Sequence, residues 1–407
     1  MEMIRQVVKE KRQAIVLIPE IALTYQTVMR FYRTFGERVS IMNSRLSPGE
    51  RFDQFERAKN GDVDIMIGPR SALFTPFSKL GLIIIDEEHE SSYKSETLPR
   101  YHARETAIER ARMCGASVVL GSATPSVESY YKAKTGEYEL LELKHRVAEK
   151  PLPKVEVVDL REELKAGNRS ILSVRLQELM EDRLKKGQQM MLFINRRGVA
   201  GFVSCRACGH VLKCPHCDVS LSQHVTRQHP EGKMVCHYCG YEIPMPKTCP
   251  HCGGNQFRRM GFGTQQMEEQ LQLLFPKSRV LRMDADTTGS RYAYEEKFAA
   301  FRNKEYEIMV GTQMIGKGLD FPDVTLVGVL SLDQALFAGD FRSYERTFSL
   351  ITQVVGRSGR GDTAGRAILQ TFLPNHYVLQ LAAQQNYPVF YEQEYAIRKT
   401  MLFPPFC

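Results

Sequence analysis

Eight of the ten cysteines in this 407-residue chain lie in four Cys-x-x-Cys pairs. The pairs are Cys205/Cys208, Cys214/Cys217, Cys236/Cys239 and Cys249/Cys252. A Cys-x-x-Cys turn presents two sulfur atoms to one tetrahedral ion, and thiolates are the ligands that structural zinc prefers. The pattern therefore predicts two Zn²⁺ ions in closed four-cysteine sites, around which this segment has to fold.

The spacing alone allows two ways of combining the pairs. In a nested arrangement the two middle pairs form an inner Cys-x2-Cys-x18-Cys-x2-Cys site, and the first and last pairs close an outer one. In a sequential arrangement the third and fourth pairs share one ion, as in a small zinc ribbon. The first two pairs would then be only five residues apart, which is tight for a second site. Both arrangements stay open on spacing.

The composition is that of an ordinary globular protein. Apolar residues make up 43% and charged residues 25% of the chain, and no apolar run approaches the roughly 18 residues of a membrane span. Paired cysteines in a chain without an export signal favour metal over disulfides and predict a cytoplasmic protein. The formal net charge of +8 permits a polyanionic partner but does not demand one.

Short β-rich runs alternate with charged amphipathic stretches in two parts of the chain. In residues 1–143 the runs are Ala14–Ile18, Val63–Ile67, Leu82–Ile85 and Val118–Leu120. In residues 155–202 and 261–386 they are Met190–Ile194, Ser278–Met283, Ile308–Val310, Val324–Val329 and Ala367–Thr371. The alternation predicts an α/β fold with two parallel-sheet lobes covered by helices. The remaining predicted parts are a linker at 144–154, a zinc-binding insertion in the second lobe at 203–260, and the start of a further domain at 387–407.

The run Leu82–Ile85 ends in an acidic sequence, Asp86-Glu87-Glu88-His89. Such a strand end places carboxylates at the carboxyl edge of a parallel sheet, where ligands bind in open α/β folds. In nucleotide hydrolases an aspartate at this place holds Mg²⁺ at the phosphates, and a neighbouring acid polarises the attacking water. Asp86 and Glu87 are therefore candidate catalytic residues. The alternative is a buried strand that meets a solvated acidic loop.

Three further segments resemble motifs of superfamily 2 helicases and follow in the order typical of them. Gly121–Ser126 is similar to the coupling motif that connects the nucleotide and nucleic-acid sites. Gly311–Asp320 is similar to the next motif, whose glycines let the backbone approach phosphates. Gln353–Arg360 is similar to the final motif, whose arginines reach across to the phosphates. The resemblance implies a motor of two RecA-like lobes that uses ATP with Mg²⁺. The residues that it places at the nucleotide are Asp86, Glu87, Gly316, Gly318, Asp320, Arg357 and Arg360.

Other segments resemble the PriA family of bacterial replication-restart (primosomal) helicases, over essentially the whole chain. They are Ile18–Thr24, Gly68–Pro76, Tyr101–Glu105, Asn195–Gly198 and Asp340–Arg346, together with the eight-cysteine insertion. The resemblance implies an ATP-dependent 3′→5′ DNA helicase that recognises stalled forks and initiates primosome assembly. The partners it implies are branched and single-stranded DNA, single-stranded DNA-binding protein, and primosome and replicative-helicase-loading proteins, with no membrane. It also favours nested zinc sites, Cys205/Cys208 with Cys249/Cys252 and Cys214/Cys217 with Cys236/Cys239.

Five residues are candidates for DNA contact. By resemblance, Arg70, Ser71 and Thr124 touch the DNA backbone. Tyr93 and Tyr101 follow the acidic motif in a polar loop, where aromatic faces can stack on single-stranded bases. For the two tyrosines, ordinary half-burial is the alternative.

The family's phosphate-binding loop, Gly-x-x-x-x-Gly-Lys-Ser/Thr, does not occur in the 407 residues. Residues Met1–Arg12 resemble the latter part of the helix that follows this loop. We therefore expect an interior fragment with an incomplete first lobe, lacking the loop, the N-terminal DNA-binding domain and the C-terminal domain. Such a chain should hydrolyse ATP only near background. The alternative function is a non-catalytic, zinc-dependent DNA- or protein-binding remnant of such a helicase.

Overall fold

The structure of the chain is a computed structural model. It describes residues 1–19, 25–44, 46–143, 151–194, 203–217, 219–224, 232–255, 257–259, 263–284, 293–312, 315, 321–338, 340–359, 361 and 363–407. These residues form two compact units, Met1–Glu139 and Leu140–Cys407, each of which is considered by itself. The division falls close to the predicted end of the first lobe at residue 143.

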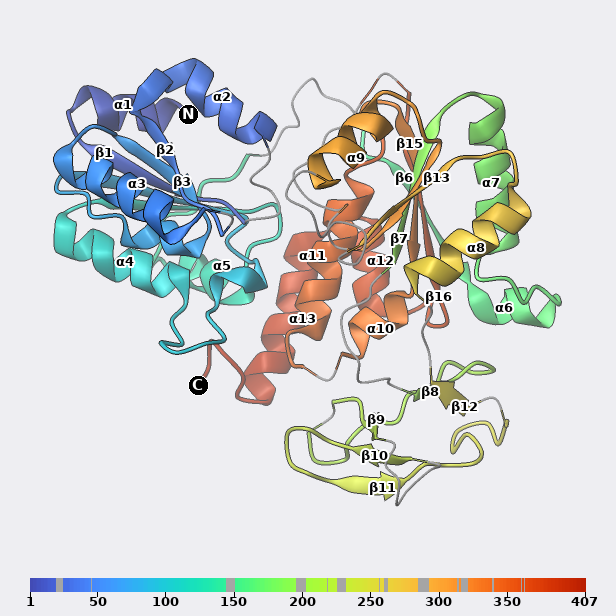
Figure 1. The fold of residues 1–407 in the computed structure, drawn as a ribbon. Coiled ribbons are helices and arrows are strands. Elements are labelled where there is room, and N and C mark those ends of the chain that lie inside the picture. Colours follow the sequence, from blue (N-terminus) through green and yellow to red (C-terminus); the bar gives the residue numbers. More distant parts are fainter. Residues whose placement is uncertain are drawn as a thin grey trace. The chain divides into compact units, whose positions relative to one another are not determined.

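The first unit contains a five-stranded sheet with the order β2-β3-β1-β4-β5, in which all neighbours run parallel. Its strands are β1 (Gln13–Leu17), β2 (Val39–Ile41), β3 (Ile65–Gly68), β4 (Leu80–Asp86) and β5 (Ser117–Gly121). Its helices are α1 (Glu2–Lys9), α2 (Tyr25–Phe35), α3 (Pro48–Asn60), α4 (Ala103–Cys114) and α5 (Val127–Lys134), with short 3-10 turns η2 (Gly36–Arg38), η3 (Arg70–Phe74) and η4 (Ser91–Tyr93). Figure 1 shows the helices lying against the sheet.

The strands of the first sheet are apolar on both faces because helices cover both. Alternate residues of β1 enter two different core clusters: Ile15 and Leu17 pack with residues of α3 and α4, whereas Ala14 and Val16 pack with residues of α1 and α2. Side chains of a strand point alternately to opposite faces, so a continuous apolar run is what a doubly covered parallel strand requires. This is the physical reason why the short apolar runs predicted a parallel sheet correctly.

The second unit contains a six-stranded parallel sheet with the order β13-β14-β7-β15-β16-β6. Its strands are β6 (Lys154–Asp159), β7 (Gln189–Ile194), β13 (Val280–Met283), β14 (Ile308–Gly311), β15 (Val324–Leu330) and β16 (Arg366–Thr371). Its helices are α6 (Leu160–Lys165), α7 (Val174–Lys185), α8 (Thr264–Leu274), α9 (Ala293–Arg302), α10 (Leu332–Leu336), α11 (Ser343–Val355), α12 (Tyr377–Ala383) and α13 (Tyr387–Thr400). Helices α7 and α8 pack on one face of the sheet (Figure 1).

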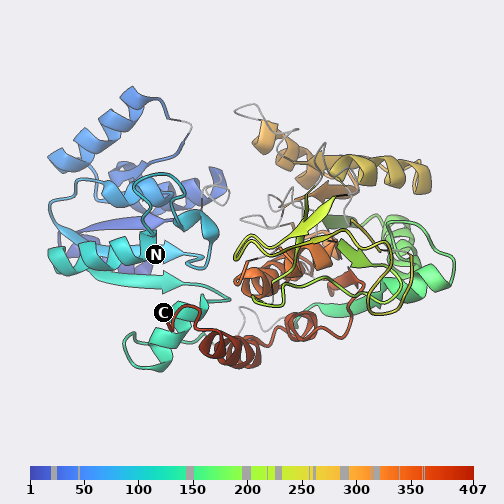
Figure 2. The ribbon, with the colours of Figure 1, turned by 90° about the horizontal axis from the view of Figure 1, so that it is seen from below.

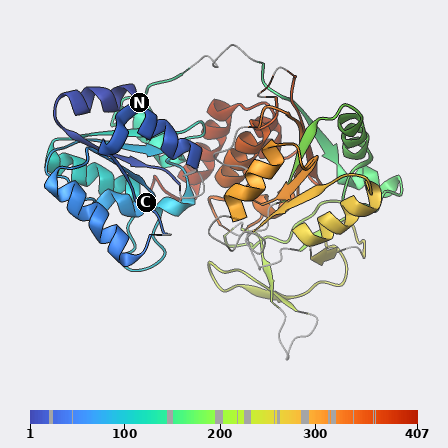
Figure 3. The same ribbon diagram turned by 45° about the horizontal axis from the view of Figure 1, so that its top comes forward.

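The cysteine-rich segment forms a small separate module between β7 and α8, here called the zinc module (residues 203–259). Its strands are β8 (Val203–Cys205), β9 (Ser222–His224), β10 (Lys233–Val235), β11 (Glu242–Pro244) and β12 (Phe257–Arg259). They form a three-stranded and a two-stranded antiparallel sheet. Figures 1 and 3 show the module as a distinct body of the second unit, and Figure 2 views it from below. The predicted insertion in the second lobe is therefore present.

The two predicted boundaries around the second lobe differ in detail from the structure. The expected linker included Lys154, but β6 begins at this residue and pairs with β16 at the edge of the sheet. Residues from 387 onward were expected to open a further domain, whereas α13 packs into the second unit, where Phe390 stacks on Phe348 of α11 at 4.2 Å between ring centroids. Among the described helices, none is both long and apolar enough to cross a membrane.

Candidate functional site

Strand β4 delivers the acidic sequence to the carboxyl edge of the first sheet. Its last residue, Asp86, pairs with Gly121 at the end of β5, so the acidic loop and the Gly121–Ser126 motif begin side by side. Asp86 is an exposed residue at this edge, and its Oδ1 accepts a hydrogen bond of 3.1 Å from the Glu87 N–H. Partial loss of water around it raises the pKa of Asp86, against the lowering effects of that N–H and of His89.

Glu87 has a left-handed backbone with φ +50°. A glutamate in this region is uncommon and costs free energy, and such residues cluster at functional sites. The turn lets the chain reverse directly after the strand, so that Asp86 and Glu87 both remain at the edge of the sheet. Residues of this kind, at this place, can hold a divalent cation or polarise a water molecule.

A short polar contact joins the acidic loop to the neighbouring motif. The His89 Nδ1 and the Ser122 Oγ lie 2.7 Å apart, and Ser122 Oγ also accepts the Thr124 N–H at 3.0 Å. Thr124 itself is 1% exposed, and its hydroxyl has no hydrogen-bond partner among the described residues. This burial does not favour the expected contact between Thr124 and the DNA backbone, which stays a prediction.

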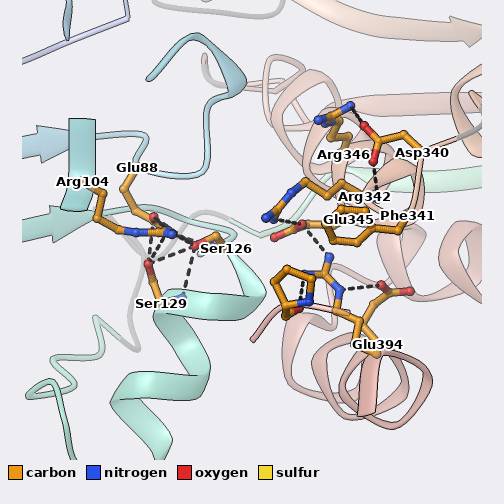
Figure 4. Close-up of polar contacts among 12 residues, drawn as sticks. Glu88, Arg104, Ser126, Ser129, Asp340, Phe341, Arg342, Glu345, Arg346 and Glu394 are labelled. Atoms are coloured by element: carbon orange, nitrogen blue, oxygen red, sulfur yellow. Dashed lines mark hydrogen bonds and ion pairs between the residues drawn. The ribbon is translucent and has the colours of Figure 1, made fainter. Parts of the chain in front are cut away.

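A buried ion pair next to this contact was not expected from the sequence. Glu88 and Arg104 are 1% and 7% exposed, and the Arg104 Nη1 donates to the Glu88 Oε2 at 2.9 Å. The Glu88 carboxylate also accepts the Ser126 N–H at 2.6 Å and the Ser129 hydroxyl at 2.9 Å, as Figure 4 shows. These bonds join the acidic loop, the start of α4 and the start of α5. The sequence offered one signal for this pair: Glu88 directly follows the expected site residues Asp86 and Glu87.

The predicted DNA-contacting residues of the first unit divide into buried and accessible ones. Tyr93 is 1% exposed, and its hydroxyl donates to the Asp86 carbonyl at 2.7 Å, so that its buried side chain supports the acidic loop. Burial raises the pKa of Tyr93. Ordinary half-burial was the alternative for this residue; the ring is covered more completely than that, which does not favour stacking on a base. Ser71 is exposed and Tyr101 is half-buried. Arg70 donates to the carbonyls of Ser92 and Lys94 at 3.1 and 2.6 Å.

An exposed aromatic residue, Phe74, was missed by the sequence analysis. It ends η3, the turn that begins at Arg70, and it is 51% exposed. Its ring meets Tyr101 edge to face with 5.2 Å between centroids. Phe74, Tyr101 and Arg70 therefore lie together at the surface of the first unit, an association that only the fold creates.

In the second unit the described part of the motor motifs is limited. Gly316, Gly318, Asp320 and Arg360 lie outside the described residues. Arg357 is half-buried and follows Gly356, the C-cap residue of α11; its N–H donates to the Val354 carbonyl at 3.1 Å. Gly359, next in the same motif, has φ +71°, and a Cβ there would meet the Gly365 nitrogen at 2.4 Å. The motif therefore needs glycine at this turn.

The eight paired cysteines form two groups in the nested arrangement. Cys205, Cys208, Cys249 and Cys252 make one group, and Cys214, Cys217, Cys236 and Cys239 make the other. Within the groups, sulfur atoms lie 3.6 Å (Cys205 and Cys252), 3.7 Å (Cys208 and Cys249) and 3.5 Å (Cys214 and Cys239) apart. A tetrahedral Zn²⁺ with Zn–S bonds of about 2.3 Å needs sulfur atoms about 3.8 Å apart. Both groups therefore fit one Zn²⁺ each.

Backbone N–H groups favour the thiolate at some of these cysteines, whereas burial raises the pKa of others, among them Cys205 and Cys214. The Gly254 N–H and neighbouring thiols lower the pKa of Cys252 to about 7. Zinc binds the deprotonated sulfur, so an N–H donor directed at it favours the liganding form. We call the group with Cys205 zinc site 1 and the group with Cys214 zinc site 2.

Three family descriptions match the chain. "DEAD/DEAH box helicase" matches residues 1–133, "Helicase conserved C-terminal domain" matches residues 258–362, and "PriA DNA helicase Cys-rich region (CRR) domain" matches residues 214–244. The first match lies within the first unit, the second covers β13, β14 and β15 of the second sheet, and the third lies within the zinc module.

Curated relatives match along the whole chain. The chain is 51% identical over 406 residues to the replication restart protein PriA of Bacillus subtilis, covering 100% of this chain and 50% of that protein. It is 46% identical over 400 residues to the protein of the same name from Synechocystis, covering 97% of this chain and 48% of that protein. The chain thus spans about half the length of these relatives.

Solved structures of helicases share the fold. The DNA-bound helicase MrfA has a TM-score of 0.52 at 13% identity, covering 95% of this chain and 43% of that one. Mycobacterium smegmatis Lhr, bound to single-stranded DNA and AMP-PNP, has a TM-score of 0.51 at 13% identity, covering 92% of this chain and 42% of that one. At this level of identity the likeness concerns the fold alone.

Proposed function

Because the chain belongs to the PriA family of replication restart proteins, we propose that the protein is an ATP-dependent 3′→5′ DNA helicase. Its task would be to recognise stalled replication forks in the cytoplasm and to initiate primosome assembly there. The observation that carries the proposal is the contact between His89 and Ser122, which ties the acidic loop to the Gly121–Ser126 motif. A motor needs such a connection, because hydrolysis of the bound nucleotide has to change how tightly the protein binds the DNA strand.

At the nucleotide, each proposed residue has a separate task. Asp86 would hold Mg²⁺, which neutralises phosphate charge when bound, and Glu87 would orient and polarise the attacking water. The exposed residue Asp86 and the left-handed turn at Glu87 support these roles. Arg357 and Arg360 would stabilise the charge that develops on the phosphates. Gly316, Gly318 and Asp320 complete the proposed nucleotide-binding set.

For DNA, we propose that the surface around η3 binds the single strand. Arg70 and Ser71 would position the backbone, and Tyr101 with Phe74 would offer a stacking surface. The 51% exposure of Phe74 and its contact with Tyr101 support this. Tyr93 and Thr124, which are buried, would act by holding the acidic loop and the neighbouring motif in place.

Partners beyond DNA follow from the family and stay proposals. They are single-stranded DNA-binding protein and the primosome and replicative-helicase-loading proteins. The zinc module would serve strand separation or docking of these proteins. With zinc bound, the net charge of the module is close to zero, because eight thiolates offset the two Zn²⁺ ions and the excess of basic residues. A nearly neutral module is better suited to such a role than to attracting phosphates by charge.

The decisive experiment measures DNA-stimulated ATP hydrolysis on two polypeptides. One is the 407-residue chain, which contains no Gly-x-x-x-x-Gly-Lys-Ser/Thr sequence. The other is lengthened at its N-terminus to include such a loop. We expect background hydrolysis from the first, and from the second a DNA-stimulated turnover that Asp86→Ala abolishes and Asp53→Ala, at an exposed position of α3, leaves unchanged.

Two outcomes would contradict these expectations. Robust ATP turnover by the 407-residue chain that disappears with Asp86→Ala would refute the expectation that this chain hydrolyses ATP only at background. Absence of DNA-stimulated turnover from the lengthened chain would refute the helicase and favour the second candidate, a non-catalytic zinc-dependent binding remnant. Unwinding of partial duplexes that carry only a 3′ or only a 5′ tail tests the direction.

A further inference from the structure

The zinc module contacts the connection between α10 and α11 of its own unit close to both ends. The Ser220 hydroxyl donates to the Phe337 carbonyl at 2.7 Å, and the Phe341 N–H donates to the Tyr238 hydroxyl oxygen at 3.2 Å. Phe337 directly follows α10, and Phe341 precedes α11. The module thus hydrogen-bonds to the backbone of this connection close to both of its ends.

A third contact fixes the module at zinc site 1. Gly209, which follows Cys208, has φ +79°, and a Cβ there would lie 2.8 Å from the Phe372 carbonyl oxygen and from the Leu373 side chain. The backbone of Gly209 therefore packs directly on the backbone of Phe372, the residue that follows β16. Together the three contacts place the module at the connection between α10 and α11 and at the residues that follow the carboxyl end of β16.

The connection before α11 is also held by α11 itself, by α13 and by the C-terminal segment. The Asp340 carboxylate accepts the Arg342 N–H at 3.0 Å and the Arg346 guanidinium at 2.6 Å, as Figure 4 shows. The Phe341 ring stacks on Phe403 at 4.9 Å, and the buried Arg398 guanidinium lies 5.3 Å from its centre. Phe341 thus contacts α13 and the C-terminal segment with its ring and the module with its N–H.

Between these contacts the module does not fill the space against the motor lobe. A cavity of about 80 Å³ is lined by Cys217 and Ser220 from the module and by Phe341, Glu394, Arg398 and Met401 from the lobe. A packed apolar interface would fix the module by shape alone. Here the position of the module depends on hydrogen bonds beside the cavity more than it would in a fully packed interface. Tyr238 makes one of these hydrogen bonds.

Helix α11 connects this contact to the final motor motif. It runs from Ser343 to Val355, most of its residues are buried, and only its C-cap residue Gly356 separates it from Arg357. At 1.5 Å per residue its 13 residues span about 20 Å. A helix packed on most sides moves as a rod, so a shift at its first turn is carried to its last.

We propose that Tyr238 is a positioning residue for the motor arginine Arg357. Its place in the Cys236-His-Tyr-Cys239 turn of zinc site 2 fixes its hydroxyl, which holds the Phe341 N–H and with it the start of α11. Zinc site 2 thereby sets where α11 ends and where Arg357 stands. The role of Arg357 in hydrolysis rests on the proposed function, whereas the physical connection from Tyr238 to α11 does not.

The connection can be tested on the 407-residue chain by amide hydrogen exchange with mass spectrometry. Tyr238→Phe removes the acceptor and keeps the ring. We expect exchange in peptides covering residues 340–346 to accelerate roughly fivefold, the loss of one net hydrogen bond, and exchange in 354–359 to accelerate to a smaller degree. Metal analysis should still find both zinc ions. Tyr241→Phe, whose ring packs on His216 within the module, is the matched control and should change neither peptide.

Two further measurements keep the test decisive. Cys236→Ser, which breaks zinc site 2, should accelerate exchange at 340–346 more than Cys249→Ser, which breaks zinc site 1. In the lengthened chain, Tyr238→Phe should lower kcat for ATP hydrolysis with little change in KM for ATP. Unchanged exchange in both Tyr238→Phe and Cys236→Ser would overturn the proposal, and so would accelerated exchange with unchanged kcat. An inactive lengthened wild type would instead refute the proposed function.

Discussion

The buried pair of Glu88 and Arg104 makes a quantitative prediction about the first unit. Arg104→Ala removes the partner of a carboxylate that is 1% exposed. Breaking a buried ion pair from one side typically costs about 3–5 kcal/mol, because the remaining charge is left without compensation. The Ser126 N–H and the Ser129 hydroxyl still donate to Glu88 at 2.6 and 2.9 Å. We therefore expect the lower end of that range, about 3 kcal/mol.

Urea unfolding followed by far-ultraviolet circular dichroism measures the effect, since the chain contains no tryptophan. With a denaturant slope of about 2 kcal/mol/M, the midpoint of the first unit should fall by about 1.5 M. The matched control is Arg112→Ala on the same helix, α4. Arg112 pairs with Glu109 at the surface, with side chains 73% and 58% exposed, so its loss should change the midpoint very little.

A double variant separates charge from packing. If the uncompensated charge causes the loss, Glu88→Gln with Arg104→Ala should be more stable than Arg104→Ala alone, because a neutral amide can keep the Ser126 N–H bond. If Arg104→Ala is no worse than Arg112→Ala, or if the double variant is less stable than Arg104→Ala, the reasoning is refuted.

Three further predictions concern other parts of the molecule. The purified chain should contain two zinc ions per molecule by metal analysis, and Cys236→Ser should lower this to one; a single zinc in the wild type would contradict the nested sites. Burial raises the pKa of Asp333 to about 6, so the folded state holds its proton over a range where the unfolded state has lost it. The free energy of unfolding should therefore fall as the pH rises from about 4 to 6, and Asp333→Asn, unfolded in urea at the same pH values, should show a smaller fall than the wild type; an equal fall would refute the assignment. Phe74→Ala should weaken binding of fluorescent single-stranded DNA by about 1–3 kcal/mol, whereas Phe52→Ala, at an even more exposed phenylalanine on α3, should not; equal losses would argue against a stacking surface at η3.

Much of the architecture was predictable because its causes are local. Apolar runs such as Val324–Val329 have to be strands covered on both faces, and they became β15 and its neighbours. Strand β6 was not expected, since its residues are half-buried at an edge and alternate with charged ones. Edge strands lack the continuous apolar run that identifies central ones.

The accessibility of the site residues was not predictable. Tyr93 and Phe74 are aromatic residues in polar surroundings, yet the first is 1% and the second 51% exposed. Which of them is covered depends on segments far away in the chain that pack against it. The Glu88–Arg104 pair was missed for the same reason, because its members are 16 residues apart and meet only when α4 lies beside the acidic loop.

The sequence by itself determined the zinc ligands, the two parallel sheets and the order of the motor motifs, since ligand chemistry and side-chain periodicity act over short stretches of chain. The tertiary structure decided which cysteine pairs share an ion, and it brought Tyr238 of the zinc module to the start of α11. Tyr238 and Phe341 are 103 positions apart, and Cys205 and Cys252 are 47 positions apart. Such contacts depend on how whole elements pack, and no local pattern of residues carries that information.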